Sequence, residues 1–178
     1  MDVEIRTPRL LLRPQVGADI PAILSGLNDW NVVRWLTVVP YPYTRGDAEE
    51  WMARQVPVVP GKAHFAIDLP GGGMIGGITL GNDLGYWLAR SQHGRGYMTE
   101  ACAAVLEWHF AALPDDVVPS GYHAGNAASA SVQRKLGFVE TGRRERRFVR
   151  SQQREVEHID TNLTKAQFDA SPIRLGRT

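Results

Sequence analysis

The sequence predicts a mixed α/β fold for this 178-residue chain, with one mostly antiparallel sheet of about six or seven strands and helices on both faces. Short apolar runs bounded by Gly, Pro, Asn and Asp alternate with segments in which apolar residues recur at helical spacing. A long helical stripe follows a glycine loop in the middle of the chain, and a second helix has signals at both of its ends. We find no repeat or linker, so residues 1–178 are expected to form one domain.

The first half of the chain is predicted to supply most of the strands. The expected elements are a strand at Arg9–Arg13, helices at Ala18–Leu27, Val32–Leu36 and Ala48–Gln55, and strands at Ala63–Leu69, Met74–Leu80 and Leu84–Ala89. Pro70–Gly73 is a hairpin signal between two of the strands. Thr37–Tyr43 contains two prolines and two tyrosines, which predicts an irregular, aromatic-lined loop.

A long helix is predicted to end at Leu113, because its apolar residues fall on one face. That face comprises Met98, Ala101, Cys102, Val105, Leu106, Phe110 and Leu113, and His109 interrupts it. Cys102 is the only cysteine, and its place on this face predicts a small core residue rather than a nucleophile. A disulfide framework and a cysteine-ligated metal site are therefore excluded, and no metal site is expected.

Gly94 and Gly96 lie where the strand must turn into this helix. Without Cβ atoms they let a ligand approach the main chain, and the N–H groups from about Gln92 to Met98 would face an anion at the positive end of the helix dipole. Arg95 adds a positive charge. The alternative is that the glycines serve the turn alone. The loop lacks the Gly-Lys-Ser/Thr of a Walker A motif and the third glycine of a dinucleotide fingerprint.

The second informative stretch is Asn126–Phe138, which follows a predicted strand at Val117–His123. Asn126 is a good helix N-cap, and Gly137 can adopt the left-handed conformation that ends a helix. Two closing strands are predicted at Phe138–Val149 and Arg154–Leu163.

Composition narrows the class of protein. The chain has 20 basic and 19 acidic residues and a formal net charge of +1, so global charge does not indicate a polyanion partner. Its N-terminus lacks the pattern of a signal peptide, and no apolar run is long enough to span a bilayer. We therefore expect a soluble, cytoplasmic protein without a membrane partner.

Together these stretches resemble the acetyl-CoA binding core of the GCN5-related N-acetyltransferases (GNAT), in particular the RimJ/RimL-like subgroup. The matching segments are 85–88 (GYWL), 94–101 (GRGYMTEA), Asn126 with Ser129, and 135–138 (KLGF). Segments 7–13 (TPRLLLR) and 47–51 (DAEEW) resemble the opening of that subgroup, so the likeness covers roughly residues 7–164. One departure is Ser91, where the wider superfamily often has Gln or Arg.

The resemblance implies a GNAT fold, acetyl-CoA as cosubstrate and an amine as acceptor. It implies that the loop holds the CoA diphosphate, that the strand before it pairs with the pantetheine arm, and that Asn126 and Ser129 lie near the thioester. The implied cofactor-binding residues are Tyr86, Trp87, Leu88, Gln92, His93, Gly94, Arg95, Gly96, Tyr97, Met98, Asn126 and Ser129. Homodimers are usual where this resemblance holds.

Acetyl transfer requires a neutral amine, a stabilised oxyanion and a leaving thiolate. Ser129 is the candidate for hydrogen bonding to the thiolate, although it is also an ordinary first-turn residue. The candidate bases are His123, Glu100 and Glu107. Each has a structural alternative, as a strand-end histidine or a solvent-facing helix residue, and a water relay is favoured over them.

The acceptor is expected to enter beside the first two helices. Trp30, Trp35, Tyr41 and Tyr43 are the candidate substrate-binding residues, and a role in the core is the favoured alternative. The identity of the amine, a protein N-terminus or a small molecule, is left open.

The segment Arg143–Arg154 holds six arginines opposed by Glu145 alone. It is a candidate nucleic-acid surface, but balanced net charge favours a solvated hairpin paired with Glu155, Glu157 and Asp160. The function predicted is thus N-acetyl transfer by direct attack. A CoA-binding regulatory module without turnover is the alternative, and an RNA-binding protein is the second rival.

Overall fold

The computed structural model describes residues 3–173. The strands are β1 (Ile5–Arg6), β2 (Leu11–Pro14), β3 (Ala63–Leu69), β4 (Gly73–Leu80), β5 (Leu84–Leu88), β6 (Val117–His123), β7 (Val139–Val149) and β8 (Arg154–Thr164). The helices are α1 (Ile20–Leu27), α2 (Trp30–Val33), α3 (Arg45–Ala53), α4 (Tyr97–Ala112), α5 (Ala127–Leu136) and α6 (Lys165–Ala170), with 3-10 turns at Gly17–Asp19 and Arg90–Gln92.

The strands form two sheets, where the sequence predicted one. The larger sheet has the strand order β1-β2-β3-β4-β5, and the smaller sheet has the order β6-β8-β7. Every pair of neighbouring strands is antiparallel. The mixed α/β fold class is confirmed, and the expected sheet of six or seven strands is corrected to five plus three. The split falls between β5 and β6, which the apolar pattern of either strand cannot reveal.

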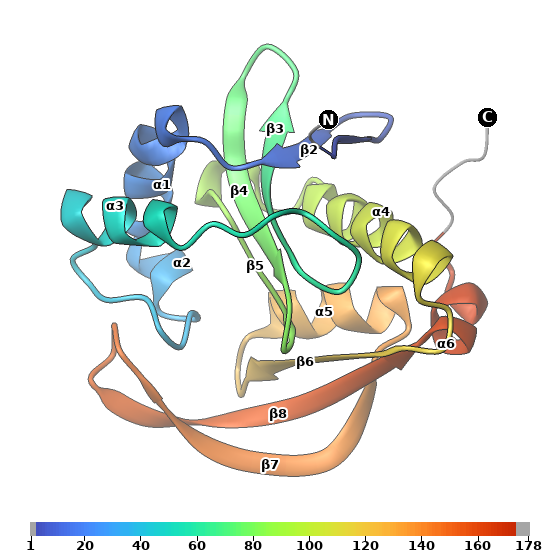
Figure 1. Cartoon of the computed structure of the whole chain (residues 1–178). Helices are drawn as coiled ribbons and strands as arrows, with labels where there is room; N and C mark the ends of the chain where they lie inside the picture. The colour runs from blue at the N-terminus through green and yellow to red at the C-terminus, as the bar shows by residue number, and fades with distance from the viewer. Residues whose placement is uncertain (1–2, 174–178) are drawn as a thin grey trace.

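Helices cover both faces of the larger sheet (Figure 1). α1 and α3 pack together on one face, where α1 contacts β4, while α4 contacts β5 and α5 on the other. The alternation of side chains along β5 links the two layers, because Tyr86 points towards α5 and Trp87 packs against Gly26 of α1.

The predicted helix face of α4 forms much of the main core. Ala101, Cys102, Val105 and Leu106 are fully buried, whereas Leu113, at the end of the predicted face, is 39% exposed. Burial raises the pKa of the Cys102 thiol, as expected for an inert core residue.

Three local predictions need correction. The strand expected at Arg9–Arg13 begins at Leu11, because the Thr7 N–H donates to the Leu10 carbonyl in a turn after β1. The helix expected at Val32–Leu36 is α2, which begins earlier because Asp29 caps it by accepting from the Asn31 N–H. α6 was not predicted, although Thr164 and Gln167 form a capping box at its start.

The helix predicted to start at Asn126 has the expected ends. Asn126 Oδ1 accepts from the Ser129 N–H at 3.2 Å, and Gly137 ends α5 with φ of 93°. The Phe138 N–H then donates to the Gln133 carbonyl, which closes the C-terminal turn.

A buried polar network joins the two sheets. Ser120 Oγ on β6 donates to the Leu84 carbonyl of β5 at 2.8 Å. Gln133 Nε2 donates to Ser120 Oγ at 3.1 Å and to the Gly121 carbonyl at 2.8 Å, while Gln133 Oε1 accepts from Thr161 Oγ1 at 2.6 Å. The Gln133 side-chain amide of α5 therefore links β6 to β8. It lies next to the Ser120–Leu84 hydrogen bond, which is the only side-chain hydrogen bond between β5 and β6 in residues 3–173.

Replacing Gln133 by Leu should leave the Ser120 and Thr161 hydroxyls short of partners and lower the free energy of unfolding by about 1–3 kcal/mol. Urea denaturation measures the loss. Arg134→Gln, an exposed change at the next position of α5, should alter stability by less than about 0.5 kcal/mol. Equal stability of the two variants would contradict the structural role of the network.

Candidate active site

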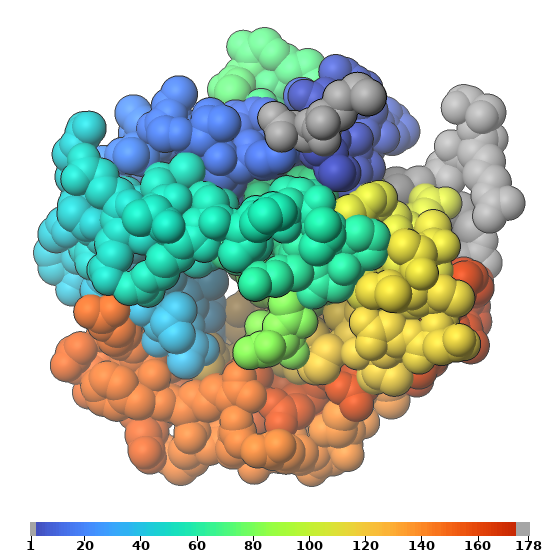
Figure 2. Space-filling model, in the orientation of Figure 1, coloured from blue at the N-terminus to red at the C-terminus, as the bar shows by residue number. Residues whose placement is uncertain are grey.

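One cavity of about 740 Å³ lies where the two sheets separate. Its walls come from α1, α2, the 37–43 loop, β5, the glycine loop, the end of β6 and the start of α5. In the space-filling view the surface is hollowed between the light-blue and teal N-terminal region and the orange β7–β8 hairpin (Figure 2). The cavity therefore joins elements that are far apart in the sequence.

The glycine loop presents unpaired main-chain amides to one end of this cavity. Within residues 3–173, the N–H groups of residues 94–99 donate to no protein acceptor, whereas those of Gln92 and His93 close the 3-10 turn. Gly94 and Gly96 have φ of 76° and 80°, a region that L side chains rarely adopt. Six free amides at the start of the 16-residue helix α4 suit an anion such as a diphosphate.

Side chains at the ends of the loop hold it in place. His93 Nε2 donates to the Leu88 carbonyl at 2.8 Å, which fixes the loop to β5. Arg9 Nη1 donates to the Arg95 carbonyl at 2.9 Å, and the same guanidinium pairs with Glu100 at 2.6 Å. Glu100 is thus engaged with the N-terminal segment, which speaks against the candidate role of a free catalytic base.

The predicted loop residues separate into two groups. Gln92, His93, Gly94, Gly96, Tyr97 and Met98 line the cavity, whereas Arg95 is exposed and outside its lining. Gln92 also carries a buried Oε1 without a hydrogen-bond partner among the described residues. An unsatisfied buried acceptor in a cavity wall indicates a position where a ligand can donate a hydrogen bond.

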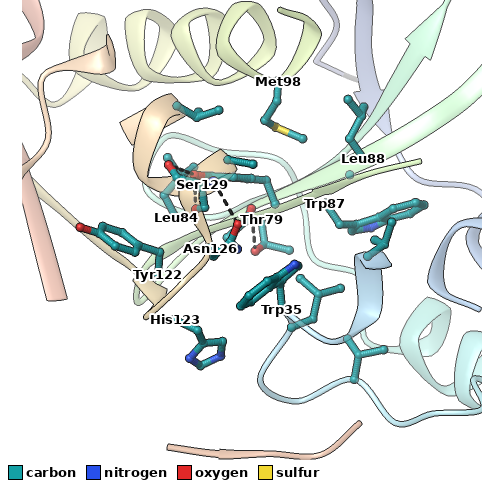
Figure 3. A pocket seen from close by; sticks show the side chains of 18 of the residues that line it. Trp35, Thr79, Leu84, Trp87, Leu88, Met98, Tyr122, His123, Asn126 and Ser129 are labelled. Atoms are coloured by element: carbon teal, nitrogen blue, oxygen red, sulfur yellow. Dashed lines mark hydrogen bonds between the residues drawn. The ribbon is translucent and has the colours of Figure 1, made fainter. Parts of the chain in front are cut away.

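Two hydroxyl groups of the cavity lining, those of Tyr86 and Ser129, form a pair. Figure 3 shows Ser129 close to Asn126 at the start of α5. Tyr86 OH and Ser129 Oγ are 2.8 Å apart, and Ser129 is held in the first turn of α5 by the Asn126 cap. Burial raises the pKa of the Tyr86 phenol, so this hydroxyl stays protonated at neutral pH. The resemblance implied a role for Tyr86 only as part of the strand that pairs with the pantetheine arm. The proximity of its hydroxyl to Ser129 is visible only in the tertiary structure.

The opposite side of the cavity is aromatic and apolar. Trp35 and Tyr43 line it, together with Ile23, Leu27, Leu36, Val39, Trp51 and Trp87, and Tyr43 is also a buried member of a hydrophobic core cluster. Trp30 and Tyr41 do not line it. They contact each other edge to face, with centroids 5.4 Å apart, and are 40% and 46% exposed, so the structure gives them neither of the expected places.

His123 lines the cavity at the end of β6 and is almost fully buried. Its Nε2 lies 3.0 Å from Thr37 Oγ1 and its Nδ1 lies 3.4 Å from His158 Nδ1. Burial lowers the pKa of His123 below its ordinary value, and the Arg147 guanidinium lowers it further. The imidazole is therefore neutral at pH 7. Glu107, the remaining candidate base, is an exposed residue of α4 outside the cavity lining.

The arginine-rich segment lies in the β7–β8 hairpin, and four of its six arginines form ion pairs. Arg144 contacts Glu140 and Glu157, Arg146 contacts Glu155, and Arg143 and Arg147 each contact Glu145 and Asp160. This is the geometry expected of a solvated, ion-paired hairpin. The expectation that nucleic acid is not a partner stays a prediction.

Residues 9–139 match the family model for the acetyltransferase (GNAT) domain. The chain belongs to this family. The predicted family is thereby confirmed, and the expectation of an acetyl-CoA-dependent acyltransferase agrees with it.

Among curated proteins, the chain is 33% identical over 61 residues to the "Putative ribosomal N-acetyltransferase YdaF" of Bacillus subtilis. The match covers 34% of this chain and spans about a third (33%) of that relative's length.

Two solved structures show the same fold. The structure of Mycobacterium smegmatis RimJ in complex with CoA-disulfide has a TM-score of 0.76 at 22% identity, covering 96% of this chain and 90% of that one. Spermidine N-acetyltransferase from Vibrio cholerae, in complex with CoA and spermine, has a TM-score of 0.75 at 17% identity, covering 90% and 98%. Because a likeness at 17–22% identity shows the fold alone, the acceptor of this chain stays open.

Neither a metal site nor a membrane span is found in the part of the chain that the structure describes. No group of three or more His, Cys, Asp or Glu side chains could hold a metal ion there. None of the helices in residues 3–173 is both long and apolar enough to cross a membrane. Cytoplasmic localisation and the homodimer remain predictions.

Replacing Gly96 by Ala should weaken CoA binding. The left-handed conformation costs an L residue about 1–2 kcal/mol, so the loop would shift and Kd would rise roughly fivefold to thirtyfold. Isothermal titration calorimetry with CoA measures the change. Gly46→Ala in α3 is the matched control, because that glycine has no positive φ and a Cβ there would meet only Thr44 Oγ1, at 3.7 Å. Unchanged affinity in Gly96→Ala would count against the loop as the diphosphate site.

Proposed function

We propose that this chain transfers the acetyl group of acetyl-CoA to a primary amine by direct attack of the amine on the thioester. The observation that carries the proposal is one cavity lined by the glycine loop with its free amides, by the Tyr86–Ser129 hydroxyl pair and by an apolar wall. These three parts of the lining suit a diphosphate, a thioester and an organic acceptor.

The residues of the cavity divide the work of the reaction. The amides of residues 94–99 bind the CoA diphosphate, which carries negative charge. β5 ends the five-stranded sheet, so its outer edge offers main-chain groups to the pantetheine arm. Ser129, hydrogen-bonded to Tyr86, donates to the leaving thiolate, whose conjugate thiol has a pKa of about 8.5 and needs only modest assistance.

The charges of the cavity lining favour an acceptor without several positive charges. Asp83 is the one carboxylate among the lining residues, and Lys135 and Arg147 are cations. A polyamine would need several carboxylates to replace its water shell. The aromatic wall of Trp35, Trp87 and Tyr43 instead suits an apolar group next to the amine. The proposed acceptor is therefore the α-amine of a peptide with an apolar N-terminal residue, or a small apolar monoamine.

The alternative is a CoA-binding module that regulates another protein without turnover. It predicts that CoA binds but that no thiol is released from acetyl-CoA in the presence of any amine. Incubation with acetyl-CoA and a mixture of peptides and amines, followed by titration of free thiol, separates the two functions.

An acceptor screen tests the proposed substrate class. Peptides beginning with Leu, Phe or Met should gain one acetyl group faster than peptides beginning with Lys or Asp, and faster than spermidine, when each is followed by mass spectrometry. The reason is the apolar wall together with the single lining carboxylate. Faster acetylation of spermidine than of every peptide would refute this substrate class while leaving acetyl transfer intact.

Ser129→Ala and Tyr86→Phe should each lower kcat by about tenfold to a hundredfold, because each removes part of one hydroxyl pair that assists the thiolate. The double variant should lose little more than either single one, since the groups act as a unit. Steady-state kinetics with a peptide acceptor measures this, and CoA affinity serves as the control for folding. Full turnover in Ser129→Ala would remove Ser129 from the mechanism.

A further inference from the structure

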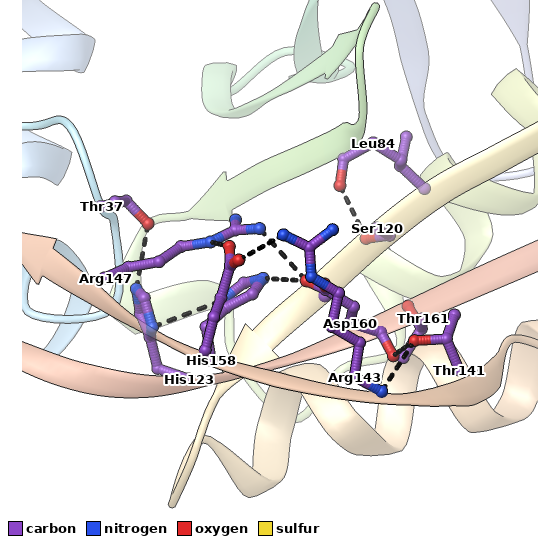
Figure 4. Close-up of polar contacts among 12 residues, drawn as sticks. Thr37, Leu84, Ser120, His123, Thr141, Arg143, Arg147, His158, Asp160 and Thr161 are labelled. Carbon is purple, nitrogen blue, oxygen red and sulfur yellow. Dashed lines mark hydrogen bonds and ion pairs between the residues drawn. The ribbon is translucent and has the colours of Figure 1, made fainter.

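A line of polar side chains runs from the cavity into the β6–β8–β7 sheet (Figure 4). Thr37 Oγ1 lies 3.0 Å from His123 Nε2, and His123 Nδ1 lies 3.4 Å from His158 Nδ1. His158 Nε2 lies 3.5 Å from Asp160 Oδ1. The strand register places His123 opposite His158 and Gly121 opposite Asp160, so this arrangement is built into the β6–β8 pairing.

The chemistry of the groups fixes where the protons lie. Arg143 Nε and Arg147 Nη2 contact the Asp160 carboxylate at 3.3 and 3.1 Å, and a carboxylate only accepts hydrogen bonds. His158 therefore carries its proton on Nε2, which leaves its Nδ1 as an acceptor. His123 must then carry its proton on Nδ1, so its Nε2 has a free lone pair towards the Thr37 hydroxyl.

Gly121 makes room for this arrangement. A Cβ at residue 121 would lie 2.3 Å from His158 Nε2 and 2.6 Å from the Ile159 carbonyl. A side chain at that position would therefore push the imidazole away from Asp160. The glycine of β6, like the histidine of β8, is needed for the line of contacts.

We propose that His123 is the base that removes a proton from the acceptor amine through the Thr37 hydroxyl, and that His158 and Asp160 are positioning residues that hold His123 in the required tautomer. Both Thr37 and His123 line the cavity. The inference rests on the proposed acetyl transfer and adds the route of the proton.

The ammonium proton passes to Thr37 Oγ1 as that oxygen releases its own proton to His123 Nε2. The neutral amine nitrogen then forms the C–N bond as the C–S bond breaks, and the second proton lost by nitrogen goes to the thiolate, giving CoA as a thiol. His123 returns its extra proton to solvent after the products leave.

The surrounding charges keep both imidazoles neutral before the reaction. Burial and Arg147 lower the pKa of His123, and the main-chain contact at Glu157 raises it to a lesser degree. Burial, Arg147 and His123 lower the pKa of His158 to about 4, against the opposing effects of Asp160 and Glu145. A base with a pKa below 6.5 suits an α-amine, with a pKa of about 7.7–8.0, better than a lysine amine near 10.4.

This charge balance sets the pH dependence. His123 loses its function as a base when it is protonated, so activity should fall as pH falls through the lowered His123 pKa. The acid limb of kcat/KM should therefore lie below pH 6.5.

Asp160→Asn is the decisive variant. The side-chain amide can donate to His158 Nε2, which reverses both tautomers and turns His123 Nε2 from an acceptor into a donor. We expect kcat to fall at least about tenfold with the KM for acetyl-CoA unchanged. Glu145→Gln is the matched control, because Glu145 also pairs with Arg147, at 2.6 Å, but forms no close contact with either histidine of the kind that joins Asp160 to His158. It should keep kcat within about twofold.

Nitrogen-15 NMR of the histidine side chains reads the tautomers directly, without turnover. The unaltered chain should show His123 protonated on Nδ1 and His158 on Nε2, and Asp160→Asn should show the reverse in a protein that still binds CoA. His123 protonated on Nε2 in the unaltered chain, or equal kcat in the two carboxylate variants, would overturn the inference. An unaltered chain that acetylates no amine would instead overturn the proposed function.

Asp160→Asn also weakens the ion pairs of Asp160 with Arg143 and Arg147, and this loss could lower kcat by itself. His158→Phe controls for that effect. It keeps both arginine contacts of Asp160 while removing the hydrogen bond to His123 Nδ1. We expect a similar fall in kcat, and wild-type kcat in this variant would count against the role of His158.

Discussion

The separation of the two sheets between β5 and β6 is the constraint on which the rest of the structure depends. At one end the strands are held by the bond from Ser120 to the Leu84 carbonyl and by the Gln133 amide behind it. Beyond that point the strands share no ladder, and the cavity lies in the space between them. A continuous sheet would use the edge groups of β5 for pairing, so the gap is what leaves them to a ligand.

The alternation of side chains along β5 separates the two sides of the cavity. Tyr86 points to the α5 face, where its hydroxyl meets Ser129, and Trp87 points to the α1 face, where its ring packs over Gly26. Adjacent residues of one strand thus contribute to the proposed thioester side and to the proposed acceptor side. This arrangement needs no flexible loop, because the period of a strand fixes it.

Charge also differs between the parts of the cavity lining. Free amides and the dipole of α4 provide positive potential at the proposed diphosphate end, while burial and Arg147 keep the imidazoles at the proposed acceptor end neutral. Arg143, Arg144, Arg146 and Arg147 of the β7–β8 hairpin pair with nearby carboxylates, and the Arg147–Asp160 pair holds Asp160 beside His158. The sequence predicts a solvated surface for the β7–β8 hairpin. In the structure, its Arg147 and His158 also form part of the cavity wall.

The sequence by itself determined the features that depend on neighbouring residues. Gly94 and Gly96, the Asn126 cap, the Gly137 end of α5 and the core position of Cys102 all follow from local sterics and periodicity, and the structure has them where expected. Only the tertiary structure decided the split sheet, the Tyr86–Ser129 pair and the Thr37–His123–His158–Asp160 line. It also placed Trp30 and Tyr41 outside the cavity. The Thr37–His123, His123–His158 and Tyr86–Ser129 contacts join residues 35 to 86 positions apart, and the split sheet depends on which strand edges meet. Hydrophobic periodicity carries no information about strand order or about pairing across the fold.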